Sequence, residues 1–198
     1  ETARNMQKVI HDQLEETTAV NVLRHALFEC SLLGTGIVKG PFNYEKQVHK
    51  WELNEMGKKE YIPYNRVVPK IEAVSCWDFY PDPSATHIQD CEYTIQRHKL
   101  NREQLRDLVN RPFFIPEAIE EILKGGPNYE ERYFENIIQS EDNDVSFNEN
   151  RYEVLEYWGI LDKQFADRID LDMSEKVSHL DSVMINAWVS GGRLLRVI

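Results

Sequence analysis

Apolar residues recur with helical spacing over the first 36 positions of the chain. Over residues 2–17 they are sparse, which predicts a helix with one narrow apolar stripe. From Ala19 they cover more than half of a helix surface, which predicts a second helix that is buried and ends at Gly34 and Gly36. The apolar positions are Met6, Val9, Ile10 and Leu14 in the first helix, and Val20, Leu23, Ala26, Leu27, Phe28, Cys30, Leu32 and Leu33 in the second.

Residues 37–98 change to the composition of strands. A polar loop with a turn at Gly57 separates two of them. The connections are mostly too short for a crossover helix, so the sheet is expected to be antiparallel. The predicted strands are 37–44, 48–53, 62–79 and 92–98, and the loop is 54–59.

A rigid corner follows the third predicted strand. Pro81 and Pro83 lack backbone donors, and Asp82 can hydrogen-bond its own turn backbone. The large aromatic residue just before the corner, Trp77, is predicted to be core, with the two prolines fixing the chain beside it.

Helical signals return after Leu100, and β character returns after residue 150. Short helices are predicted over 102–109, 117–124 and 129–139, with an acidic, Asn-rich loop over 140–150. Residues 152–161 predict a strand. Residues 182–198 predict two strands joined by Gly191 and Gly192, the two-residue pattern of a tight hairpin.

These elements predict an α+β fold in which an antiparallel sheet is flanked by helices. Three regions are expected: residues 1–100 with helices and sheet, 101–150 with short helices and the acidic loop, and 151–198 rich in strands. The chain begins without Met and stops inside a predicted strand, so we expect it to be a fragment of a longer polypeptide.

Charge narrows the set of partners. The net charge of −11 predicts repulsion from nucleic-acid phosphates and from anionic membranes. No apolar run is long enough to span a bilayer, so no membrane partner is expected. The two mildly basic stretches, Arg97–Lys99 and Arg193–Arg196, are interpreted as solvated strand ends.

Three widely spaced cysteines indicate buried free thiols from a reducing cytosol.

Carboxylates near the corner are the best candidates for chemistry. A metal-dependent nuclease or hydrolase that uses Asp78 and Asp82, with Asp90 nearby, is the enzyme alternative. Such a site needs a further acidic residue and a lysine on an adjoining strand, where this chain has Gln-Arg-His-Lys at 96–99. Turn formation is therefore the preferred role of these aspartates.

Other signatures of cofactor or metal binding are incomplete. The glycines at 34 and 36 follow a helix, whereas a phosphate-binding loop precedes one. The six histidines lack the spacings of metal ligands. Residues 142–153 place oxygen side chains as a calcium loop does, but Phe147 stands where that loop needs glycine. We therefore predict no cofactor, no metal site and no catalytic residue.

The aromatic residues at strand ends could be imagined as a base-stacking platform. Acidic neighbours, Asp78, Asp82 and Glu156, would repel the phosphates, so a core role is preferred. The aromatic residues concerned are Trp77, Phe79, Tyr80, Trp158 and Trp188.

Five stretches, taken in order, carry a recognisable pattern. They read Gly-Thr-Gly-Ile-Val at 34–38, Val-Ser-Cys-Trp-Asp-Phe-Tyr-Pro-Asp-Pro-Ser-Ala at 74–85, Cys-Glu-Tyr-Thr-Ile-Gln-Arg-His at 91–98, Tyr-Glu-Val-Leu-Glu-Tyr-Trp-Gly at 152–159 and Asn-Ala-Trp-Val-Ser-Gly-Gly-Arg-Leu-Leu-Arg at 186–196. This order resembles that of the portal (head-to-tail connector) proteins of short-tailed bacteriophages. The resemblance covers most of the chain, and its motifs are structural rather than chemical.

The resemblance implies a structural subunit rather than an enzyme. Portal proteins form homo-oligomeric rings, typically dodecamers, at one capsid vertex of the virion, and DNA passes through the ring during packaging and ejection. Implied partners are the capsid protein, the packaging ATPase (terminase), head-completion or tail proteins, and transient, non-specific double-stranded DNA. Assembly would begin in the cytoplasm of the host bacterium.

By the same resemblance, residues 1–100 would be wing-like, 101–150 stem-like and 151–198 a truncated clip-like segment. The acidic charge suits a channel wall, because a basic lining would slow DNA through repeated phosphate contacts. A generic protein-binding module that shares an antiparallel sheet is a third interpretation.

The last segment is predicted to be an oligomer-facing β-hairpin. It is more apolar than one sheet face requires, and an apolar edge is a template for association. The candidate interface residues are Trp188, Val189, Gly191, Gly192, Leu194 and Leu195.

Overall fold

The computed structural model describes residues 2–53, 57–130, 150–162 and 182–198. It has an α+β fold with antiparallel sheets, which confirms the predicted fold class. The chain forms two compact units: unit 1 comprises residues 1–77 and unit 2 comprises residues 78–198. The boundaries expected near residues 100 and 150 stay predictions.

Unit 1 begins with two helices, α1 (Thr2–Glu16) and α2 (Ala19–Leu33). Between them Thr18 has a φ of 52°, and this left-handed conformation redirects the chain. α2 ends at Gly34, whose φ is 80° and whose N–H donates to the Cys30 carbonyl. Both helices lie where the apolar spacing predicts them.

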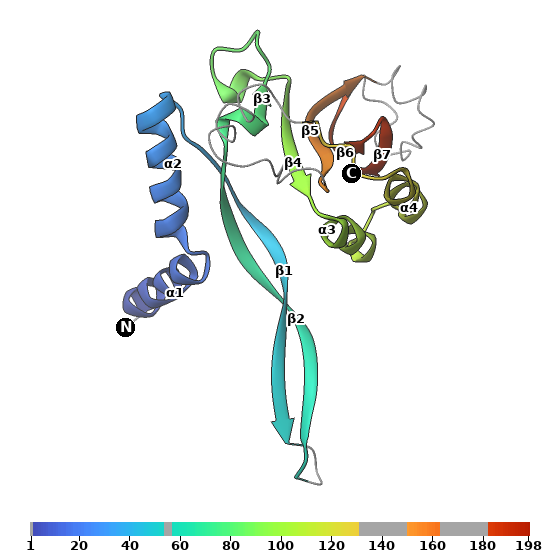
Figure 1. The fold of residues 1–198 in the computed structure, drawn as a ribbon. Coiled ribbons are helices and arrows are strands. Elements are labelled where there is room, and N and C mark those ends of the chain that lie inside the picture. Colours follow the sequence, from blue (N-terminus) through green and yellow to red (C-terminus); the bar gives the residue numbers. More distant parts are fainter. Residues whose placement is uncertain (1, 54–56, 131–149, 163–181) are drawn as a thin grey trace, which may run out of the picture. The chain divides into compact units, whose positions relative to one another are not determined.

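A long two-stranded antiparallel ribbon follows, formed by β1 (Ile37–Leu53) and β2 (Lys59–Val74) (Figure 1). The strands have a register irregularity between Lys39 and Phe42. The interruption expected between residues 44 and 48 is absent. Residues 59–67 of β2 are all exposed, so polar side chains in this part of the ribbon stay in water and do not break the pairing.

The expectation that α2 is buried is wrong for the described structure. α2 buries Ala19 and Ala26 and none of its large side chains. The backbone of α2 approaches the chain closely just before β1, because a Cβ on Gly36 would overlap the Ala26 carbonyl oxygen.

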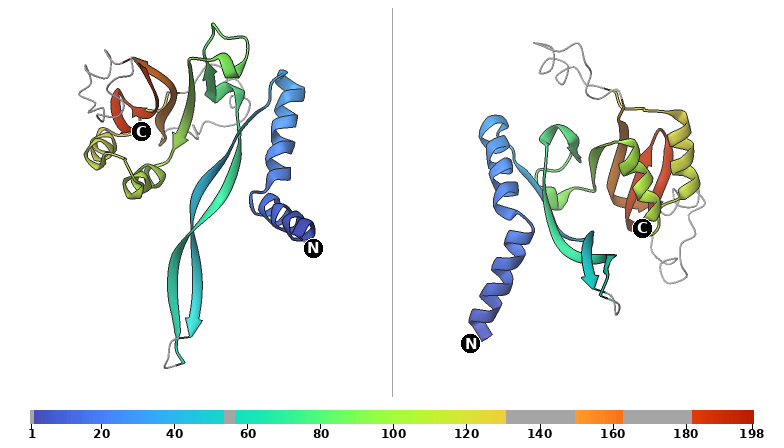
Figure 2. Two further views of the ribbon diagram at one scale, coloured as in Figure 1. Left: turned by 180° about the vertical axis from the view of Figure 1, so that it is seen from behind. Right: turned by 60° about the horizontal axis from the view of Figure 1, so that its bottom comes forward.

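Unit 2 contains a five-stranded antiparallel sheet in the order β3-β4-β5-β6-β7 (Figure 2). The 3₁₀ turns η1 (Cys76–Asp78) and η2 (Ile88–Asp90) flank its first strand. The strands are β3 (Phe79–Pro81), β4 (Tyr93–Leu100), β5 (Tyr152–Asp162), β6 (Ser182–Ser190) and β7 (Arg193–Val197). The predicted C-terminal hairpin is confirmed, with Gly191 at φ 53° and Gly192 at φ 74° between β6 and β7.

Two short helices, α3 (Arg102–Asp107) and α4 (Pro116–Gly125), contribute to the core of unit 2, with the 3₁₀ turn η3 (Leu108–Asn110) after α3. Asn101 begins α3 with a capping box, because its side chain and that of Gln104 each accept from the other's backbone N–H. The buried core residues are Leu105, Leu108, Phe114, Ile119, Ile122, Tyr152, Val154 and Leu195.

The prediction that Trp77 is core is wrong, because its side chain is 43% exposed. β2 ends at Val74, and Trp77 falls in the 3₁₀ turn that follows. The predicted helix over 129–139 and the calcium-like loop over 142–153 lie mostly outside the described residues.

Candidate functional site

The acidic corner is a hydrogen-bonded turn. One oxygen of the Asp82 carboxylate accepts from the backbone N–H of Ser84 at 2.8 Å and from its hydroxyl at 2.7 Å. The other oxygen accepts from the Glu92 N–H at 3.3 Å. The Ser84 hydroxyl and N–H hold the pKa of Asp82 below its ordinary value, burial opposes them, and the Glu92 N–H adds to their effect. The turn-forming role predicted for Asp82 is confirmed.

Asp78 has a different partner. Its carboxylate lies 2.7 Å from Nε and 2.6 Å from Nη2 of Arg97, whose side chain is fully buried. The interpretation of Arg97 as a solvated strand end is therefore wrong. Burial opposes the charge of Arg97, but the hydrogen bond and charge of Asp78 outweigh burial and raise its pKa.

This pairing weakens the nuclease interpretation. A divalent cation would need the Asp78 carboxylate to be free, but that carboxylate is bonded to the Arg97 guanidinium. Glu153, the last position of the calcium-like loop, also lies near Arg97, at 3.7 Å. Among the described residues, no group of three or more His, Cys, Asp or Glu side chains is close enough to hold a metal ion.

A buried polar network crosses β4, β5 and β6, and the sequence did not predict it. Glu156, which is 3% exposed, lies 2.8 Å from His98 Nε2 and accepts from Trp158 Nε1 at 2.8 Å and Asn186 Nδ2 at 3.2 Å. Asn186 in turn accepts from Trp188 Nε1 at 3.1 Å. A patterning signal does exist, since Glu156 comes two residues after apolar Val154 and therefore lies on the same buried face of β5.

The network has the character of a structural element rather than a substrate site. Both Glu156 oxygens are engaged by groups of the sheet itself, and the His98 ring stacks on Trp188 with centroids 4.9 Å apart. Such a network specifies how β4, β5 and β6 pair. Trp158 is 46% exposed, so the core role preferred for it is wrong, whereas Trp188 is half-buried.

The predicted oligomer interface on the C-terminal hairpin needs correction. Leu195 is fully buried in the core of unit 2, and Trp188 packs against Phe114 with ring centroids 5.4 Å apart. The outer edge of β7 is also covered, because the Ile115 N–H donates to the Leu195 carbonyl at 2.8 Å. Leu195 therefore cannot face a neighbouring subunit while unit 2 is folded.

The other members of the predicted interface remain accessible to different degrees. Val189 and Leu194 are half-buried, and Gly191 and Gly192 are exposed at the turn. Their contact with a second subunit stays a prediction. The reason first given for it, an apolar edge without a partner, does not apply to β7.

Large apolar side chains are exposed on unit 1 instead. The outer face of α2, by which we mean Val20, Leu23, Leu27, Phe28 and Leu32, is 50–68% exposed. The α1 stripe, Met6, Val9, Ile10 and Leu14, is 51–67% exposed. Exposed apolar groups that are contiguous in this way mark interaction surfaces.

The far part of the ribbon carries aromatic side chains in water. Trp51 and Tyr61 lie opposite each other in the register, with centroids 5.2 Å apart, and His49 stacks on Tyr61 at 5.4 Å. Trp51 is among the most exposed aromatic residues of the described chain. A two-stranded ribbon is marginally stable by itself, so this part of unit 1 also fits a chain that contacts a partner.

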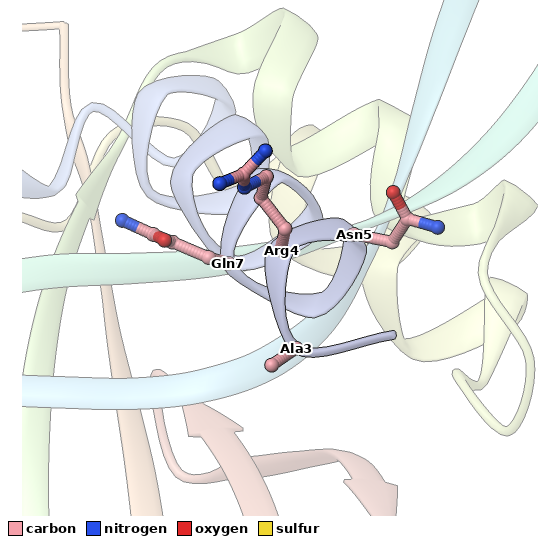
Figure 3. Close-up of a pocket in the computed structure, with 4 residues that line it drawn as sticks. All are labelled: Ala3, Arg4, Asn5 and Gln7. Carbon is pink, nitrogen blue, oxygen red and sulfur yellow. The ribbon is translucent and has the colours of Figure 1, made fainter. Parts of the chain in front are cut away.

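A hollow beside the first turns of α1 does not form a ligand site. Its lining residues are Ala3, Arg4, Asn5 and Gln7 (Figure 3). All four are exposed, and the figure shows them projecting to different sides of the helix. Within the described residues, no helix is both long and apolar enough to cross a membrane.

No protein-family model matches the chain, and no curated protein matches it at a significant level.

Proposed function

We propose that the chain is a structural subunit of a viral portal ring at the capsid vertex of a short-tailed bacteriophage. In this role it lines the channel for DNA packaging and ejection and belongs to the point where the tail attaches. The proposal includes a dodecameric ring, contacts with capsid protein, packaging ATPase and tail proteins, and assembly in the host cytoplasm. It assigns no catalytic residue.

The observation that carries the proposal is the apolar surface of unit 1. Ten large apolar side chains are exposed on α1 and α2. Full burial of one such side chain is worth about 1.5–3 kcal/mol, so a chain that works alone keeps them inside. Their exposure supports a subunit that completes its core against other subunits, as the five portal-like stretches of the sequence also imply.

The enzyme alternative has less support. It requires Asp78 and Asp82 to share a cation, but Asp78 bonds Arg97 and Asp82 bonds its own turn. Isothermal titration of the protein with magnesium, manganese, calcium and zinc should give at most millimolar binding. A micromolar site that Asp82→Ala removes would restore the enzyme interpretation.

Electron microscopy of the purified protein tests the ring directly. We expect closed rings with a central channel and a uniform number of subunits, confirmed by mass photometry. Particles that stay monomeric at every concentration when the polypeptide is full-length would contradict the proposal and favour the binding-module interpretation.

A further inference from the structure

The two exposed apolar surfaces of unit 1 are of different kinds. The α1 stripe is narrow, because Met6, Val9, Ile10 and Leu14 recur at three- and four-residue steps. The outer face of α2 is broad, since at about 100° per residue its five members cover close to half of the helix. Rows of side chains on one helix pack into the grooves between side chains of another, so two apolar helix surfaces of this kind can pair.

The charges beside these two surfaces are opposite in sign. Arg24 lies in the middle of the outer face of α2, within one turn of Val20, Leu27 and Phe28. Asp12 borders the α1 stripe, one turn from Val9. Neither Arg24 nor Asp12 has an ion-pair partner among the described residues.

The α1 stripe and the outer face of α2 do not cover each other within one chain. Glu16, at the end of α1, is held by Arg66 of β2 through two contacts of 3.3 Å. The turn at Thr18 separates the helices, and both apolar surfaces remain more than half exposed on average. Each surface is therefore open to a second molecule.

A second copy of the chain fits these surfaces better than a lipid bilayer does. Residues 1–36 carry three basic and five acidic side chains, so the two helices together have a charge of −2. Interfacial helices that bind anionic lipid have basic polar faces. A second copy of the chain supplies an α1 stripe for the outer face of α2, an outer face of α2 for the α1 stripe, and a charge of opposite sign beside each.

We propose that the α1 stripe of one copy packs on the outer face of α2 of the next copy, with Asp12 beside Arg24. This inference rests on the proposed function and names the partner surface within it. Because the two surfaces differ, the contact is head-to-tail and repeats, so it can close into a ring. Nine side chains at roughly 60–120 Å² each, about half exposed, supply on the order of 400 Å². That is well below the roughly 1,200 Å² of a stable pairwise interface, so closure must add contacts elsewhere.

A charge exchange tests the contact. Sedimentation velocity over a concentration series is measured for Asp12→Arg, Arg24→Glu and the double variant. We expect each single variant to weaken self-association about tenfold and the double variant to restore it. Leu27→Glu, at an exposed position, should abolish association while circular dichroism shows the fold retained.

Glu15→Arg is the matched control. It makes the same charge change three residues along α1, on the side opposite Met6 and Ile10, and loses only an exposed contact with His11. The proposal is overturned if Glu15→Arg weakens association as much as Asp12→Arg does, or if the double variant is no better than the singles. It is also overturned if the wild-type protein stays monomeric but binds anionic vesicles.

Microscopy of the same variants separates this inference from the proposed function. Rings that persist unchanged in Asp12→Arg and Leu27→Glu would refute the helix contact and leave the portal proposal standing. Association that responds to the charge exchange without ring closure would support the helix contact and contradict the portal proposal.

Discussion

Asp78 and Asp82 lie four residues apart in the sequence but have unrelated roles in the structure. Asp78 neutralises the buried guanidinium of Arg97, whereas Asp82 accepts two hydrogen bonds from Ser84 in its own turn and one from the Glu92 N–H. The sequence indicated the turn because proline and serine flank Asp82. It did not indicate the ion pair, because Arg97 belongs to a strand that arrives later in the chain.

Asp82 should make stability depend on pH. Hydrogen bonds lower its folded-state pKa, so its contribution is present above the unfolded value of about 3.9 and is lost as the pH falls through the folded value. Asp82→Asn keeps an oxygen for the Ser84 bonds but removes the charge. We expect the melting temperature of the wild-type protein to exceed that of Asp82→Asn at pH 7, and the difference to disappear at acidic pH.

The control for this measurement is Asp90→Asn, at an exposed position of η2 in the same loop. A difference between wild type and Asp82→Asn that stays constant from neutral to acidic pH would contradict the role given to the carboxylate charge.

Leu195 and Trp77 exchange the roles that the sequence predicted for them. Leu195 is fully buried among α3, α4 and the sheet, so Leu195→Ala should cost about 2–5 kcal/mol of unfolding free energy. Trp77 is 43% exposed, so Trp77→Ala should cost less than about 1.5 kcal/mol. Chemical denaturation of both variants measures the two losses of unfolding free energy. A larger loss for Trp77→Ala than for Leu195→Ala would show that Trp77 is a core residue.

At the scale of elements, local signals predicted more than burial signals did. The helix end at Gly34, the capping residue Asn101, and the turn at Gly191 and Gly192 depend on a few adjacent residues, and the structure has all of them. Burial of α2 was predicted wrongly because apolar spacing shows that a face needs a partner but not whether this chain supplies one. The Glu156 network was missed because its members come from three strands that only the fold brings together.

The hairpin turn between β6 and β7 should depend on backbone conformation at Gly192. Its φ is 74°, and an added Cβ would meet no atom within 4 Å, so only the backbone resists substitution. Gly192→Val should lower stability by about 1–3 kcal/mol, since β-branched residues avoid this region. Gly192→Asn, which tolerates positive φ, should lower it much less. Equal losses in denaturation curves would show that some other property of the turn decides.

At the scale of the whole molecule, the charge is distributed unevenly. Residues 37–74, a range that contains both strands of the ribbon, carry seven Lys or Arg against five Glu, a charge of +2. The rest of the chain therefore carries a charge of −13, and the two parts together give the net charge of −11. Any attraction to nucleic acid should be confined to the ribbon, and the remainder of the surface should repel phosphate.

Duplex DNA should consequently bind weakly and without sequence preference. Fluorescence anisotropy with a short labelled duplex should give a Kd no tighter than roughly 10⁻⁵ M at about 150 mM salt, where screening limits attraction to within roughly 8 Å. At low salt some binding should appear, and reversing Lys58 and Lys59 in the ribbon to Glu should remove it. The same reversal at Arg102 and Arg106, exposed on α3, should change DNA binding little, because unit 2 is already strongly acidic.

Weak binding matters for the channel-wall role, since each phosphate that a wall neutralises adds salt-dependent friction to DNA passage. Nanomolar binding that survives 150 mM salt would show a protein that holds DNA rather than lets it pass.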